Sequence, residues 1–87
     1  MATTQITLSN TAWTDISSGA ANGLVTNESF SNVIIRESVG LPGAGVTDGH
    51  TMYPGKDGFY NWAGVTENIY ARMLPNVKVG NVEVTPQ

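Results

Sequence analysis

The sequence predicts an all-β fold, a small antiparallel β-sandwich or jelly-roll-like barrel of about seven short strands. The whole chain, residues 1–87, is expected to form this single β domain. Short β-branched and aromatic runs recur at intervals of about 8 to 12 residues with Gly and Pro between them, which is typical of sandwiches and barrels. No segment shows the apolar spacing of a convincing amphipathic helix, and the chain has no internal repeat.

Length and residue types limit which stabilising devices the chain can use. A chain of 87 residues buries somewhat more than roughly 60 % of its unfolded surface, so we expect modest stability. It contains no Cys and a single histidine, His50, which excludes disulfides, thiolate metal sites and an all-histidine zinc site. We therefore expect no cofactor and no metal, and partner subunits are the remaining supplement for a fold of this size.

The charge pattern argues against nucleic-acid and membrane partners. The net charge is −3, and only 13 % of residues are charged against about 25 % in ordinary domains, so hydroxyl and amide groups must solvate the surface. The four basic residues form no run, so we expect no nucleic-acid binding: Arg36, Lys56, Arg72 and Lys78. No apolar run approaches 18 residues, so we expect no membrane span.

The N-terminus Met-Ala-Thr-Thr-Gln lacks the basic and apolar regions of a signal peptide. We therefore expect synthesis in the cytoplasm without export by a signal peptide. The Asn27-Glu28-Ser29 sequence matches a glycosylation sequon, and for the same reason we expect that match to be chance.

The first half of the chain is expected to supply four strands. Thr3–Leu8 alternates like a half-buried strand, and Ala12–Ile16 resumes an extended pattern in which Trp13 is expected to pack in the core. After the loop of residues 17–23, Leu24–Thr26 gives a short third strand. The segment from Asn27 to Asn32 is polar apart from Phe30 and leads into the strongest strand of the chain.

That strand, Asn32–Val39, contains three adjacent β-branched residues, Val33, Ile34 and Ile35. Such a run predicts burial on both faces at one end, while Arg36 and Glu37 emerge into solvent. The Gly-rich segment Gly40–Gly49 follows and is expected to be a surface loop. Its glycines are spaced as GxGxxxG rather than GxGxxG and no helix follows, so a phosphate-binding loop is not expected.

The stretch Met52–Trp62 is expected to reverse the chain direction. Pro54-Gly55 and Asp57-Gly58 are both turn signals, and Phe59–Trp62 then reads as a short aromatic strand. Two interpretations of its aromatic residues remain open. They form part of the core, which we favour, or Tyr53, Tyr60 and Trp62 form a platform on which a carbohydrate stacks.

Two strands are expected near the end of the chain. Glu67–Leu74 is compatible with a helix by propensity, but its short length and its place between strands favour a strand with Ile69, Ala71 and Met73 on one face. In Val77–Val84 the valines change phase at Gly80-Asn81, which predicts a β-bulge or a tight turn there.

Polar residues give no motif for catalysis. The residues considered are Asp48, His50, Lys56, Asp57 and Glu67. Asp48 and His50 could pair a carboxylate with an imidazole, but no motif places a nucleophile beside them, and the acidic residues lack the spacing of a calcium loop. We therefore expect that the protein is not an enzyme. Exposed, sparsely charged sheet edges favour docking on another subunit instead.

Several short pieces of the chain together resemble a family of virion proteins. They are Ile6-Thr7-Leu8, Thr11-Ala12-Trp13-Thr14-Asp15-Ile16, Val33-Ile34-Ile35, Tyr53-Pro54-Gly55, Ile69-Tyr70-Ala71-Arg72 and the valine-rich end. This succession resembles the small single-domain β-sandwich virion proteins of tailed bacteriophages, of the capsid decoration (cement) or head-fibre type. The resemblance covers nearly the whole chain.

The resemblance implies a structural protein on the capsid surface of a phage particle. The favoured role is a decoration protein that binds the major capsid protein as a homo-oligomer, with a trimer favoured. The alternative is a tail or fibre component that mediates host-surface or carbohydrate binding. The chain begins at Met1 and ends soon after its last expected strand, which favours the stand-alone decoration protein.

If the decoration role is correct, the contacts are expected from the segments least committed to the core. These are the N-terminal segment and the loop after the strongest strand, with Ala2, Thr3, Thr4, Gln5, Leu41, Pro42, Val46 and Thr47 as the expected partner-binding residues.

Overall fold

The computed structural model describes residues 3–17, 19–43, 45–54, 58–64, 67–74 and 76–86. Within these residues the all-β prediction is confirmed, because eight strands and no helix are present. In chain order the strands are β1 (Thr4–Ser9), β2 (Thr14–Asp15), β3 (Gly23–Asn27), β4 (Val33–Ser38), β5 (His50–Met52), β6 (Phe59–Trp62), β7 (Asn68–Met73) and β8 (Val79–Pro86).

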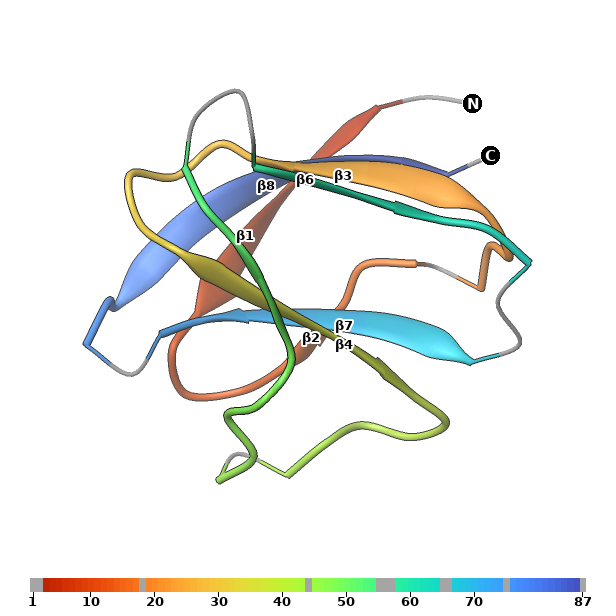
Figure 1. Ribbon diagram of the computed structural model, residues 1–87. Helices are drawn as coiled ribbons and strands as arrows, with labels where there is room; N and C mark the ends of the chain where they lie inside the picture. Colours follow the sequence, from red (N-terminus) through yellow and green to blue (C-terminus); the bar gives the residue numbers. More distant parts are fainter. Residues whose placement is uncertain are drawn as a thin grey trace.

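The strands form two antiparallel sheets that pack as two layers (Figure 1). One sheet has the order β1-β8-β3-β6 and the other the order β2-β7-β4-β5. The pairs β1–β8, β2–β7, β3–β6 and β4–β5 make one long ribbon in which the first half of the chain runs against the second half. Rolling this ribbon adds the pairs β3–β8 and β4–β7, which close the two sheets. This connectivity is that of an eight-stranded jelly roll.

The core lies between the two sheets, where alternate residues of each strand point inward. The sheet that contains β8 contributes Leu8, Val25, Trp62, Val82 and Val84, and the sheet that contains β7 contributes Val33, Ile35, Met52, Ile69, Ala71 and Met73. Ile16 follows β2 and completes this cluster. The core residues alternate along each strand, so the alternation seen in the sequence corresponds to this core.

The segment Glu67–Leu74 forms a strand rather than a helix, as favoured from the sequence. As β7 it lies between β2 and β4, and its inward face carries Ile69, Ala71 and Met73. Its outward face carries Tyr70 and Arg72, which are also buried. A strand buried on both faces needs cover on its outer side, and that cover comes from loops described below.

The bulge expected at Gly80-Asn81 is not observed. The register of β1 against β8 runs without interruption from Thr4↔Val84 to Ser9↔Val79. The phase change of the valines has another cause, since Val79 points to solvent while Gly80 occupies the inward position against the Met73 side chain. A Cβ on Gly80 would lie 2.6 Å from the Met73 methyl carbon, so a larger residue here would require the flexible end of the Met73 side chain to move.

The sequence also missed one strand, β5. His50–Met52 contains three residues, which is too short to show alternation, and it has no run of β-branched residues. Its place in the fold comes from pairing with β4, in the register Val33↔Met52 to Ile35↔His50.

The connections between strands gather at two ends of the sandwich (Figure 1). We call one end the Phe30 end; it contains the β1–β2, β3–β4, β5–β6 and β7–β8 connections. We call the other the terminal end; it contains the β2–β3, β4–β5 and β6–β7 connections together with the start of β1 and the end of β8. Successive strands are antiparallel, so each connection returns the chain to the opposite end.

Candidate docking surface

The most exposed large apolar side chain on the described residues is Phe30, at the tip of the β3–β4 connection. Its relative exposure is 101 %, so none of the other described residues covers the ring. A phenyl ring left wholly in water gives up roughly 1.5–3 kcal/mol of burial free energy, which a binding partner could recover. Such a residue is a candidate anchor for a protein interface.

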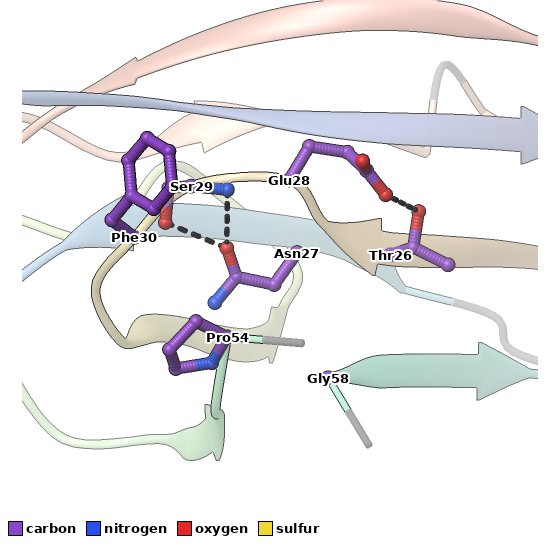
Figure 2. A pocket seen from close by; sticks show the side chains of 7 residues that line it. All are labelled: Thr26, Asn27, Glu28, Ser29, Phe30, Pro54 and Gly58. Atoms are coloured by element: carbon purple, nitrogen blue, oxygen red, sulfur yellow. Dashed lines mark hydrogen bonds between the residues drawn. The ribbon is translucent and has the colours of Figure 1, made fainter. Parts of the chain in front are cut away.

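A buried asparagine holds the loop that carries Phe30. The Asn27 Nδ2 donates to the carbonyls of Ser31, at 2.8 Å, and of Met52, at 2.9 Å. Its Oδ1 accepts from the backbone N–H of Ser29, at 2.9 Å, and from the Ser29 hydroxyl, at 2.6 Å; Figure 2 shows these two bonds converging on one oxygen. Two of these four bonds fix the backbone on either side of the tip, at Ser29 and Ser31, and a third ties the loop to β5 at Met52.

The backbone of this loop is tied to neighbouring strands as well. The Asn27 N–H donates to the Gly58 carbonyl at 2.7 Å, and the Glu28 N–H donates to the Asn81 carbonyl at 3.0 Å. Phe30 is thus presented by an ordered loop, so binding through it costs little additional loop-ordering entropy. The same bonds explain why the Asn27-Glu28-Ser29 sequon is not presented for glycosylation, since the Asn27 side chain is buried.

Two open hollows lie on either side of Phe30. The larger, of about 480 Å³, is lined by Thr26, Asn27, Glu28, Ser29, Phe30, Pro54 and Gly58, and Figure 2 shows Pro54 facing the loop across it. The smaller, of about 240 Å³, is lined by Glu28, Ser29, Phe30, Ser31, Val77, Val79, Gly80 and Asn81. A partner could therefore contact the projecting Phe30 ring and also place side chains in the two shallow hollows beside it.

Other exposed apolar residues gather at the same end. Six large apolar side chains are exposed on the described residues, and four of them lie at the Phe30 end: Phe30, Tyr53, Phe59 and Val79. Two exposed charges of opposite sign, Glu28 and Lys78, accompany them. An apolar centre with a thin charged rim is the composition of a protein interface.

The expected N-terminal contacts lie elsewhere, along β1. Thr3, Thr4 and Gln5 are exposed, and Ala2 lies outside the described residues. Thr4 and Gln5 are paired with β8, and the Thr3 hydroxyl is 2.7 Å from the Thr85 hydroxyl. These residues are accessible, but they belong to the sheet rather than to a loose arm.

The expected contacts in the β4–β5 loop divide into two kinds. Leu41 and Thr47 are exposed and Pro42 is half-buried. Val46 is different, because its side chain packs on an outer cluster of Trp13, Ile34 and Tyr70. The loop, of which residue 44 is outside the described part, is therefore anchored to the fold through Val46.

Arg72 and Trp13 make that anchor. The Trp13 Nε1 donates to the Val46 carbonyl at 2.8 Å, and an Arg72 guanidinium nitrogen donates to the same oxygen at 3.2 Å. Arg72 is only 2 % exposed, donates further to the carbonyls of Met73 and Asn10, and lies with its Cζ 5.7 Å from the Trp13 ring centroid. Main-chain carbonyls and an indole face replace water around this buried charge.

The three residues of the proposed carbohydrate platform do not form one surface. Trp62 is buried, its ring lies across Gly23 where a Cβ would collide with it, and its Nε1 donates to the Ala20 carbonyl at 3.1 Å. Tyr60 is half-buried against the core, whereas Tyr53 is exposed. The core interpretation is therefore correct for Trp62 and partly for Tyr60, and it is wrong for Tyr53.

Tyr60 bridges the edges of the two sheets, because it lies on β6 while its partners lie on β4 and β5. Its hydroxyl donates to the Glu37 carboxylate at 3.3 Å, and its ring stacks on His50 with centroids 6.1 Å apart. Burial raises the pKa of Tyr60 above 10.0, and the charge and hydrogen bond of Glu37 raise it further, because both disfavour the phenolate.

Asp48 and His50, which could have paired a carboxylate with an imidazole, contact different residues. Asp48 forms a salt bridge with Arg36, with 3.1 Å between nitrogen and oxygen, while the His50 ring stacks on Tyr60. Among the described residues no group of three or more His, Cys, Asp or Glu side chains could hold a metal ion. No described helix is long and apolar enough to cross a membrane.

Comparisons with protein-family models, with curated proteins and with solved structures found no significant match for this chain. The candidate surface therefore depends on the geometry above. Sequence reasoning missed the Phe30 end, although one signal was present: Phe30 is the single apolar residue in the polar stretch from Asn27 to Asn32. Its exposure depends on where the strands on either side of it lie.

Proposed function

We propose that this protein is a structural component of a tailed-phage virion, a capsid decoration protein that binds the major capsid protein on the capsid surface and acts as a homo-oligomer. The observation that carries the proposal is the Phe30 end, where an ordered loop presents a fully exposed aromatic ring among other exposed apolar residues. Such a surface suits a persistent protein contact better than chemistry on a small substrate.

The jelly-roll connectivity is compatible with this role and does not decide it. Jelly rolls occur in viral capsid domains and also in lectins and cupins, so function has to be argued from the surface rather than from the fold. The resemblance to phage virion proteins supplies the capsid as the partner. The sparse charge and the small size of the domain fit a protein that is stabilised by binding to a larger shell.

Cosedimentation with empty capsids of the phage that encodes the protein tests the proposal. The wild-type protein should bind saturably, in a stoichiometry set by the capsid lattice. Phe30→Ser should weaken binding at least tenfold, as expected for an aromatic anchor. Leu41→Ser is the control, because it removes another exposed apolar side chain, one at the terminal end, and should leave affinity within about threefold.

Other results of these binding experiments would contradict the proposed docking surface or the proposed partner. If Leu41→Ser abolishes binding and Phe30→Ser does not, the contacts come from the β4–β5 loop and the Phe30 end is not the docking surface. Binding confined to one vertex or to tails would replace decoration by the tail or fibre role. Saturable binding to a glycan that is lost in Tyr53→Ala or Phe59→Ala, with no binding to capsids, would indicate carbohydrate recognition instead.

A further inference from the structure

Strand β1 is an unprotected sheet edge. It stands at the end of the order β1-β8-β3-β6 and pairs with β8 on one side. Its six residues, Thr4–Ser9, include no charge, proline or glycine, and its ladder with β8 has no bulge. Natural sheets usually protect an edge with one of these features, because an open row of N–H and C=O groups pairs readily with another strand.

The other edges in the described part of the chain are shorter. Strand β2 has two residues, β5 has three and β6 has four. Among these edges β1 therefore offers the longest row of backbone groups to a partner.

Exposure defines which part of β1 a partner can reach. Thr3, Thr4, Gln5 and Thr7 are exposed and Ile6 is half-buried, whereas Leu8 is fully buried. The accessible run is thus residues 3–7, and its centre is Gln5. A strand with an accessible, uncharged run can pair with an identical strand across a twofold axis, since no like charges then face each other.

We propose that two copies of this chain pair through β1, antiparallel, with the twofold axis at Gln5. This register places Gln5 opposite Gln5, Thr4 opposite Ile6, and Thr3 opposite Thr7 of the other copy. Residues on the same side of the strand face one another in every pair, as antiparallel pairing requires. The pairing joins the two sheets that contain β8 into one continuous sheet.

Two features of β1 fit this register. Ile6 points to the core side yet stays half-buried because it lies at the edge, and Thr4 of the second copy would cover it. On the outer side, the two Gln5 amides can donate to and accept from each other. Other registers either exclude part of the accessible run or bring the buried Leu8 into the pairing.

The dimer does not depend on the proposed function, and it differs from the trimer that the resemblance to virion proteins favours. Because the two β1 strands run in opposite directions, the two Phe30 ends lie at opposite extremities of the dimer. If the protein decorates a capsid, one dimer would then bridge two capsid subunits.

A single cysteine tests the register directly, since the chain contains none. Residues opposite each other in an antiparallel pair have Cα atoms about 4.5–5.5 Å apart, which a disulfide can span. Gln5→Cys should therefore give a covalent dimer under mild oxidation at high protein concentration. Thr7→Cys is the matched control, because in this register the two Thr7 positions are displaced by four residues, about 13 Å along the strand.

Light scattering and sedimentation equilibrium of the unmodified protein give the second readout. The mass should be that of a dimer, and Gln5→Lys should weaken self-association at least tenfold by placing two like charges opposite each other. That lysine faces Glu83 within its own copy, so folding should be retained. Asn61→Lys makes the same charge change on the opposite edge of the sheet and should leave the dimer intact.

Several results would overturn the proposal. A monomer at high concentration, or a trimer, would exclude pairing through a twofold β1 contact. Cross-linking of Thr7→Cys in preference to Gln5→Cys would exclude the register, and dissociation by Asn61→Lys alone would place the contact on β6. Capsid binding is not part of any of these measurements, so the β1 dimer can be excluded while the binding of the protein to capsids stands.

Discussion

The Trp13 indole donates a 2.8 Å hydrogen bond to the main-chain carbonyl of Val46, which lies 33 positions further along the chain. This contact holds the β4–β5 loop over the outer face of β7. A loop that is glycine-rich in sequence thereby covers the outer cluster of Trp13, Ile34 and Tyr70. The loop is part of the fold, and only its exposed members, such as Leu41 and Thr47, are free to meet a partner.

Trp13→Phe should cost about 1 kcal/mol of unfolding free energy, because it keeps the ring but removes the donor to Val46. The cost should stay near this value since Arg72 still donates to the same carbonyl. Urea unfolding measures the loss. Hydrogen exchange of the Val46 amide, which bonds to the Gly43 carbonyl, should also quicken. Unchanged stability together with unchanged exchange would show that the indole bond does not hold the loop.

Arg72→Met should destabilise the fold by about 3 kcal/mol, because it removes the hydrogen bonds from a buried guanidinium to three main-chain carbonyls. The carbonyls that lose this donor are those of Asn10, Met73 and Val46, and Val46 keeps its bond from Trp13. Urea unfolding again gives the value.

Arg36→Met is the control for this change. Its ion pair with Asp48 is largely solvated, as the Asp48 side chain is 84 % exposed, so the loss should be within about 1 kcal/mol. Equal losses for the two arginine variants would mean that burial of Arg72 by the loop contributes nothing.

Asn27→Asp should cost about 3 kcal/mol or more near neutral pH. The substitution keeps the shape but replaces two donated hydrogen bonds by a buried carboxylate that faces the carbonyls of Ser31 and Met52. Capsid binding through Phe30 should fall with it, because the loop loses its support.

Asn61→Asp makes the same chemical change at an exposed position of β6 and should be nearly neutral. If Asn27→Asp were equally mild, the hydrogen-bond network would not be what orders the Phe30 loop.

Stability should fall as the pH rises above about 10, in part through Tyr60. Its pKa is raised in the fold by burial and by Glu37, so above its ordinary pKa the unfolded chain has released a proton that the folded chain retains. The unfolded state then binds fewer protons, and the free energy of unfolding decreases with pH. Below pH 10 the contribution is complete.

Tyr60→Phe should flatten this alkaline decline, measured by urea unfolding at a series of pH values. Tyr53→Phe, which changes an exposed phenol at the Phe30 end, is the control and should leave the slope as in the wild type. An identical slope in Tyr60→Phe and wild type would assign the alkaline loss to other groups.

The sequence by itself determined the class of fold and the position of most strands. Alternation in β1 and the β-branched run at Val33, Ile34 and Ile35 predicted strands because period-two burial is a local property of the chain. The same reasoning correctly placed Ile69, Ala71 and Met73 on one face of β7.

Tertiary structure decided everything that depends on which surfaces meet. Val46 was expected to be free for a partner, because the sequence does not show that Trp13 and Arg72, which are distant in the chain, bond to its carbonyl. Phe30 was an isolated apolar residue until the fold left it uncovered at one end, and the open edge of β1 exists only because the sheet order places that strand last. The periodicity of the sequence indicates whether a side chain is buried. Which neighbour buries it, or whether any does, depends on how strands that are distant in the chain pair and pack in the jelly roll.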